Sequence, residues 1–152
     1  MKSTRCYILT ALLLAPLAGL HAENTCSPIL PARFTQIRTI SSAPPVRTAA
    51  ESLRDFLKAR GVDIPMVTAD GTDETPVAGT ILLGTTADTP LLARWAKEGR
   101  LSVTAPDSAG DAYEVAVLDG VLVVNGVNAR AVLDGVFELE DVIAEHGGVP
   151  AD

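Results

Sequence analysis

The segment 111–125, DAYEVAVLDGVLVVN, decides the fold of this chain. It contains two runs rich in aliphatic residues, 112–118 and 121–125, and Asp119-Gly120 separates them. This dipeptide is preferred in the two-residue type I′ turn of a β-hairpin, because both of its residues tolerate positive φ. The sequence therefore predicts two antiparallel strands joined by a tight turn.

A helix is expected directly after the hairpin. Asn128 is a good N-cap residue, and the apolar residues that follow step by four, three and four positions, as one helix face requires. These apolar residues are Val132, Val136, Leu139 and Ile143. The helix is therefore predicted to pack this face against the sheet.

Before the hairpin, a first helix is predicted over 49–60. Thr48 and Glu51 form an S/T-x-x-E capping box, and Gly61 supplies the residue that commonly follows a helix. Residues 41–46 contain two consecutive prolines, which remove backbone donors and restrict the chain. We expect a turn or an extended linker there.

Three further strands and a short helix complete the pattern. Strands are predicted at 32–40, 64–68 and 80–84, and the last carries three consecutive aliphatic residues, as is typical of a strand buried on both faces in the middle of a sheet. Thr89 is expected to cap a helix that starts at Pro90. Its apolar stripe consists of Leu91, Leu92 and Trp95.

The predicted order is β-α-β-β-α-β-β-α. It indicates an α/β two-layer sandwich, in which helices pack on a mixed β-sheet. We assign this single domain to 33–146, with a tether at 23–32 and a C-terminal tail at 147–152. Residues 1–22 have the layout of a signal peptide, with two basic residues, an apolar run over 6–20 and a cleavage site expected after Ala22. The expected location is periplasmic or secreted.

The formal net charge of −7 argues against a nucleic-acid or anionic-membrane partner, since both require a basic surface. Cleavage would leave Cys26 as the single cysteine and His146 as the single histidine. Cys26 is interpreted as an inert thiol, and His146 as a residue of a final helical turn. No metal site and no cofactor are expected.

Carboxylates are the most numerous candidates for chemistry. Asp134, Glu138, Glu140 and Asp141 are neighbours on the last helix, but a solvated acidic face is the simpler interpretation. An enzymatic role would need a cleft that gathers carboxylates such as Glu114 and Asp119. No catalytic residue is assigned.

Two other patterns have structural alternatives. The turn 84–86, Gly-Thr-Thr, follows a buried strand as a phosphate-binding loop would, but it lacks a full motif and Asp88 would repel an anion. Trp95 and Tyr113 could stack on a sugar, yet the helical stripe that contains Trp95 favours a buried position.

Four segments together carry a resemblance to a known family: 50–61 (AESLRDFLKARG), 80–85 (TILLGT), the hairpin 111–125 and 126–141 (GVNARAVLDGVFELED). In these segments the chain resembles the small N-terminal α/β domain that precedes the catalytic barrel in α-glucuronidases and β-N-acetylhexosaminidase-like glycoside hydrolases. The matching positions in the last segment are Gly126, Asn128, Arg130, Ala131, Gly135, Phe137 and Leu139.

The resemblance implies a non-catalytic accessory domain of an exported glycan-degrading enzyme, truncated before a (β/α)₈ barrel that would carry the acid and base carboxylates. None of the matching positions is catalytic in that family, and the resemblance implies that Gly135 allows the last helix to pack closely. The alternatives are a stand-alone periplasmic module that binds a glycan or a protein, and a small enzyme. A domain separated from its barrel is expected to expose an apolar patch of several hundred Å².

Overall fold

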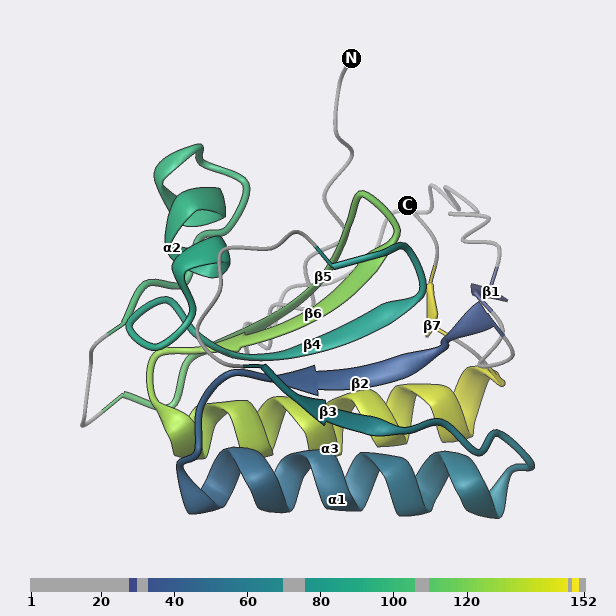
Figure 1. Cartoon of the computed structure of the whole chain (residues 1–152). Helices are drawn as coiled ribbons and strands as arrows, with labels where there is room; N and C mark the ends of the chain where they lie inside the picture. The colour runs from purple at the N-terminus through teal and green to yellow at the C-terminus, as the bar shows by residue number, and fades with distance from the viewer. Residues whose placement is uncertain (1–27, 30–32, 70–75, 106–109, 148, 151–152) are drawn as a thin grey trace, which may run out of the picture.

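The computed structural model describes residues 28–29, 33–69, 76–105, 110–147 and 149–150. A five-stranded sheet with the strand order β3-β2-β4-β6-β5 forms its centre (Figure 1). The strands β2, β3, β4 and β6 are mutually parallel and β5 is antiparallel to β6. Their bounds are β2 Gln36–Thr39, β3 Met66–Thr68, β4 Thr80–Thr85, β5 Tyr113–Leu118 and β6 Val121–Gly126.

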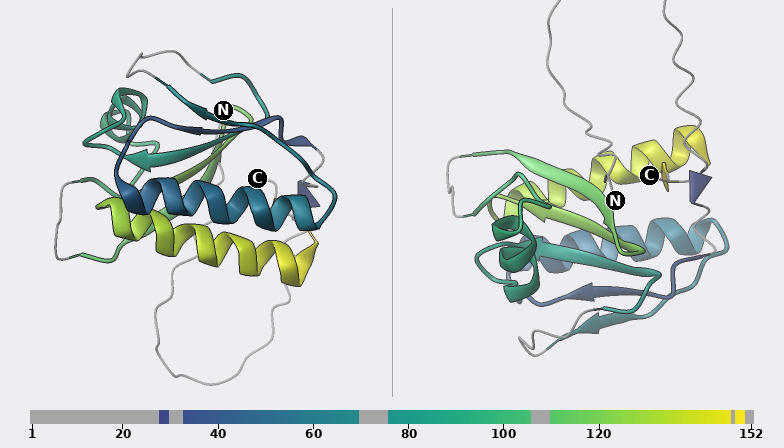
Figure 2. Two further views of the ribbon diagram at one scale, coloured as in Figure 1. Left: turned by 60° about the horizontal axis from the view of Figure 1, so that its bottom comes forward. Right: turned by 90° about the horizontal axis from the view of Figure 1, so that it is seen from above.

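The helices lie on both faces of this mixed sheet. Helices α1 (Pro44–Ala59) and α3 (Ala129–His146) run side by side on one face, and the short helix α2 (Pro90–Lys97) covers part of the other face (Figures 1 and 2). The predicted α/β class, the mixed sheet, the helix layer and the element order are thereby confirmed.

The strand alternation divides the apolar side chains between two cores. Toward α1 and α3, the sheet contributes Ile37, Ile81, Leu83, Leu122 and Val124 to one buried cluster. Toward α2, it contributes Leu82, Leu118, Val121 and Val123 to a second. Every residue of β4 is buried, which confirms the prediction that this strand lies in the middle of the sheet.

The hairpin forms as predicted. Leu118 pairs with Val121 across the turn. Asp119 has a φ of 54° and Gly120 a φ of 78°, so both central residues have the positive φ of a type I′ turn. The turn thereby fixes the register of the two strands.

The start of α1 differs from the prediction. The helix begins at Pro44, so the two prolines occupy its first two positions instead of an extended linker, and Thr48 lies inside the helix. The first backbone N–H groups of a helix have no intrahelical partner, and proline therefore costs little there. The expected capping box is wrong for the same reason, because Ala43 is the N-cap residue.

The other helix ends follow the sequence signals more closely. Asn128 caps α3, since its Oδ1 accepts hydrogen bonds of 3.0 Å from the backbone N–H groups of Arg130 and Ala131. Thr89 precedes α2 and Pro90 is the first helical residue, as predicted, but the Thr89 side chain makes no capping hydrogen bond.

Two glycines of the last segment are required by close contacts. A Cβ at Gly135 would lie 2.8 Å from Val124 Cγ1 and 3.0 Å from Tyr113 Cδ2, so α3 approaches the hairpin at this position as expected. A Cβ at Gly126 would lie 2.6 Å from the backbone N of Val132, where β6 turns into α3.

The two ends of the chain contain a second, small sheet. Strand β1 (Pro28–Ile29) pairs in antiparallel fashion with β7 (Val149–Pro150), so the ranges assigned to the tether and the tail contribute one strand each. The predicted signal peptide lies outside the described residues. In the part of the chain that is described, no helix is long and apolar enough to cross a membrane.

Candidate functional site

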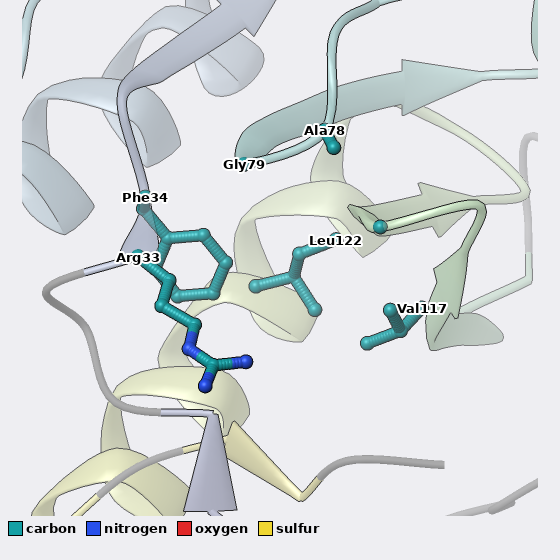
Figure 3. A pocket seen from close by; sticks show the side chains of 7 residues that line it. Arg33, Phe34, Ala78, Gly79, Val117 and Leu122 are labelled. Atoms are coloured by element: carbon teal, nitrogen blue, oxygen red, sulfur yellow. The ribbon is translucent and has the colours of Figure 1, made fainter.

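An apolar hollow opens at the end of the sheet where the hairpin turns (Figure 3). Its volume is about 280 Å³. The side chains of Phe34, Val117 and Leu122 point toward its interior, and Arg33 extends along one side of it (Figure 3). Ala78, Gly79 and Gly120 complete the lining.

Three segments that are far apart in the sequence form this hollow: the residues before β2, the loop before β4 and the β5–β6 hairpin. The Gly79 N–H donates to the Gly120 carbonyl over 2.8 Å, and the Gly79 carbonyl accepts from the Thr35 N–H over 2.9 Å. A Cβ at Gly79 would lie 2.7 Å from the Arg33 carbonyl oxygen, and the φ of Gly79 is +89°. Glycine at this position therefore lets the three segments meet and leaves the apolar side chains around an open space.

The electrostatics of the hollow are simple. Phe34 and Leu122 are buried. Arg33 is exposed, and no ion pair of its guanidinium is found among the described residues. The site can therefore accept an apolar group, and the adjacent positive charge would oppose a cation there.

The four α3 carboxylates do not share one face. Asp134 and Glu138 flank Gly135, on which the Tyr113 ring packs, whereas Asp141 is exposed. The predicted solvated acidic face is therefore divided, and two of its members lie beside β5. Burial raises the pKa of the Tyr113 hydroxyl, and the negative charges of Glu138, Asp134 and Asp111 add to this effect.

Glu140 faces the other helix. Its Oε1 accepts a hydrogen bond of 2.8 Å from Ser52 Oγ of α1. Partial burial raises the pKa of this carboxyl, while the bond from Ser52 works in the opposite direction. Glu140 therefore joins α1 to α3 and does not belong to a solvated face.

Glu114 and Asp119, the pair named for an enzymatic cleft, lie at opposite ends of β5. Glu114 Oε2 accepts from the N–H groups of Ser102 (2.8 Å) and Val103 (2.9 Å). Asp119 Oδ2 accepts from Arg100 Nη2 over 2.8 Å. Each carboxylate holds the loop after α2 against the hairpin, and the structure does not bring the two together.

The turn after β4 is closed by its own side chains. Thr85 Oγ1 accepts from the N–H groups of Ala87 and Asp88, both over 3.2 Å, and donates to Asp88 Oδ2 over 3.2 Å. A Cβ at Gly84 would lie 2.5 Å from Thr89 Oγ1. These contacts support the interpretation of Gly84-Thr85-Thr86 as a structural turn and not as a phosphate-binding loop.

Two buried polar atoms near this turn have no hydrogen-bond partner in the described structure. They are Thr89 Oγ1 and Asn125 Oδ1. Asn125 lies opposite Gly84 in the β4–β6 pairing, so both atoms belong to residues beside this glycine. The Asn125 amide nitrogen donates to the Val103 carbonyl over 2.8 Å.

Of the two aromatic candidates for a sugar platform, Trp95 is 2% exposed and packs in the core beneath α2. The helical stripe therefore indicated its position correctly. The Arg100 guanidinium lies 5.2 Å from the Trp95 ring centroid. Tyr113 is half-buried on β5 and packs against α3.

The remaining candidates are peripheral. His146 is the last residue of α3, as the sequence suggested, and its Nε2 lies 3.7 Å from Glu145 Oε2. Cys26 lies outside the described residues. Among those that are described, no group of three or more His, Cys, Asp or Glu side chains could hold a metal ion.

The hollow was not predicted from the sequence. Its lining residues come from the segment before β2, the loop before β4 and the hairpin, and no local spacing connects them. The only available signals were Arg33-Phe34 at the start of a predicted strand and the small residues Ala78-Gly79.

The fold and the site define this protein as an α/β domain with a mixed five-stranded sheet and an apolar hollow. No family model matches the chain, and no curated protein matches it. Among solved structures it is similar to a GH138 enzyme targeting pectin rhamnogalacturonan II, with 14% identity and a TM-score of 0.49. The match covers 77% of this chain and 14% of that chain. At this identity and TM-score, the similarity assigns neither family nor function.

Proposed function

We propose that this chain is a non-catalytic accessory domain of an exported glycoside hydrolase that degrades glycans, of the α-glucuronidase or β-N-acetylhexosaminidase-like kind. The observation that carries the proposal is that several residues of the resemblance have a structural role in the turn before α3 and in the packing of this helix. Gly126 and Gly135 stand where a Cβ would collide with Val132 and Val124, and Asn128 caps α3. These three members of the shared pattern are thus required by the fold itself, whereas Arg130 and Phe137 of the same pattern are exposed.

The structural hydrogen bonds of the candidate carboxylates support the same proposal. Glu114 and Asp119 hold the loop after α2, and Glu140 binds Ser52 between two helices. These side chains stabilise the domain. Under the proposal, glycosidic bond hydrolysis takes place on a barrel elsewhere in a longer protein, and this domain packs beside it.

The test is the intact mass of the natural protein. Residues 48–54, TAAESLR, follow an arginine and end in one, so trypsin releases them as a peptide that identifies the protein in the exported fraction. The proposal expects a species heavier than the 15.8 kDa of this chain by at least the ~250 residues of a barrel. It also expects that species to hydrolyse glycosidic bonds.

A stand-alone module that binds a glycan or a protein is the second candidate, and the open hollow favours it. The exposed apolar side chains are compared with the apolar patch expected of a domain separated from its barrel. Those most exposed among the described residues lie on three different elements, which does not favour such a patch. They are Val67 on β3, Val77 before β4 and Phe137 on α3. A mass equal to that of the chain without its first 22 residues would refute the accessory-domain proposal and support this one.

A further inference from the structure

Strand β5 is an open edge of the sheet. It is the last strand in the order β3-β2-β4-β6-β5, and no other described strand pairs with its outer side. The Ala112 carbonyl accepts from the Val127 N–H over 3.0 Å. Because backbone direction alternates in an antiparallel ladder, Tyr113, Val115 and Val117 turn their N–H and C=O groups outward.

The usual protection of an edge strand is weak here. Edge strands are commonly kept short or guarded by charged residues and prolines. The opposite edge, β3, has 3 residues, whereas β5 has 6 and contains a single charged residue, Glu114. The Glu114 carboxylate is committed to the Ser102 and Val103 N–H groups, so it does not guard the edge.

The side chains of the three outward residues all lie on the α3 face of the sheet, since they alternate with those that face α2. At one end of the strand, Val117 lines the apolar hollow. In the middle, half-buried Val115 packs against the core beneath α3. A strand added to this edge would place alternate side chains in line with Val117, Val115 and Tyr113.

The charges at the two ends of this surface are opposite. At the Tyr113 end stand the carboxylates of Asp111, Asp134 and Glu138. Arg130 Nε lies 3.9 Å from Asp134 Oδ2, but the Arg130 side chain is 85% exposed, so this ion pair is weak and the end of the strand keeps its negative charge. At the hollow stands the Arg33 guanidinium. A basic side chain on an added strand is therefore attracted to the Tyr113 end and repelled from the hollow.

We propose that the β5 edge binds an extended segment of a partner protein as a sixth strand, and that this segment has the pattern aliphatic–x–aliphatic–x–basic. The first aliphatic side chain packs at the hollow beside Val117, the second beside Val115, and the Lys or Arg beside Tyr113 faces Asp134 and Glu138. Backbone hydrogen bonds hold the segment, and the side-chain pockets and charges select it.

A second copy of the chain fits this surface poorly. Strand β5 itself, YEVAVL, has no basic residue. Each copy carries a net charge of −7, so two copies repel each other, and a second β5 would place an uncharged side chain or Glu114, not a Lys or Arg, opposite Asp134 and Glu138. The chemistry therefore points to a basic partner segment.

The test uses the full chain and two fluorescent peptides, TVTVTKT and TVTVTET, at low ionic strength. Binding is followed by anisotropy, and the bound region is located by amide hydrogen exchange. We expect the lysine peptide to bind about tenfold more tightly than the glutamate peptide, the size of one or two partly exposed charge pairs. The amides of Tyr113, Val115 and Val117 should exchange more slowly when it is bound.

A charge-reversed variant separates this proposal from non-specific attraction. In Asp134→Lys/Glu138→Lys the preference should reverse toward the glutamate peptide. The matched control, Asp141→Lys/Glu145→Lys, changes the net charge equally on the same helix and should keep the lysine preference. Equal binding of both peptides, protection outside β5, or a dimer that protects the same amides without peptide would overturn the proposal.

Discussion

Replacement of Gly135 by alanine tests whether α3 packs on the hairpin as tightly as the structure indicates. The added Cβ would lie 2.8 Å from Val124 Cγ1 and 3.0 Å from Tyr113 Cδ2. Tyr113 is half-buried on an edge strand and can shift, but Val124 is fully buried and β-branched, so its methyl group has little freedom. Overpacking of this kind costs about 1–3 kcal/mol.

The same substitution removes a glycine from a helix interior, which is worth about 1 kcal/mol in favour of the variant. The free energy of unfolding should therefore fall by up to about 2 kcal/mol for Gly135→Ala, once the gain is set against the overpacking cost. Urea unfolding measures the difference. With a slope of about 2 kcal/mol per M, the midpoint should fall by up to about 1 M.

Two control experiments separate the close contact at Gly135 from the general preference of a helix for alanine over glycine. Ala144→Gly, at an exposed position of the same helix, measures the local helix preference and should destabilise by about 1 kcal/mol. In a double-mutant cycle, Val124→Ala should remove most of the penalty at Gly135, since it deletes the obstructing methyl groups. An increase in stability for Gly135→Ala alone, equal to the reverse of Ala144→Gly, would refute the close-contact argument.

Three further predictions concern single contacts. Asn128→Ala should lower the free energy of unfolding by about 1 kcal/mol through loss of the α3 cap, whereas Thr48→Ala should change it by less than about 0.5 kcal/mol, because Thr48 does not cap α1; chemical denaturation compares them. Gly84→Ala should destabilise the domain less in a Thr89→Ala background than alone, since the obstructing Oγ1 is then absent. Burial raises the pKa of Glu140 above 4.5, so the native state binds the proton more tightly than the unfolded state and stability should fall as pH rises through the window just above that value. Glu140→Gln should flatten this dependence in thermal unfolding, and an unchanged profile would contradict it.

Elements with strong local signals were predictable from the sequence. The hairpin follows from Asp119-Gly120, whose positive φ values the structure confirms. The last helix follows from Asn128 and the spacing of its apolar residues, and both the cap and the buried stripe are present. In each case, residues adjacent in the chain determine the conformation.

Errors arose where one sequence signal admits two structures. Consecutive prolines exclude a helix interior but suit its first turn, so Pro44-Pro45 gave no unique boundary. An S/T-x-x-E pattern occurs inside helices as well as at their start, and α1 contains Thr48 in its second turn. The sequence therefore predicted the existence of α1 correctly, but the predicted start at residue 49 is later than the observed start at Pro44.

The neighbours of each α3 carboxylate could not be predicted from the sequence. Residue spacing gives the angle of a side chain around the helix axis, but not which residue of another element that side chain contacts. Glu138 and Glu140 are two residues apart, and one approaches Tyr113 of β5 while the other meets Ser52 of α1. The same applies to the hollow, whose walls come from three segments that are far apart in the sequence.

The open edge of β5 connects these observations. Its outward direction depends on the hairpin register, which the Asp119-Gly120 turn determines locally. Its charge depends on α3, which Gly135 allows to lie directly beneath Tyr113, and this brings Asp134 and Glu138 to the strand. Gly135→Ala, which overpacks this contact and pushes α3 away from Tyr113, should therefore also weaken the lysine preference of the β5 edge, because it moves the carboxylates of Asp134 and Glu138 away from the strand.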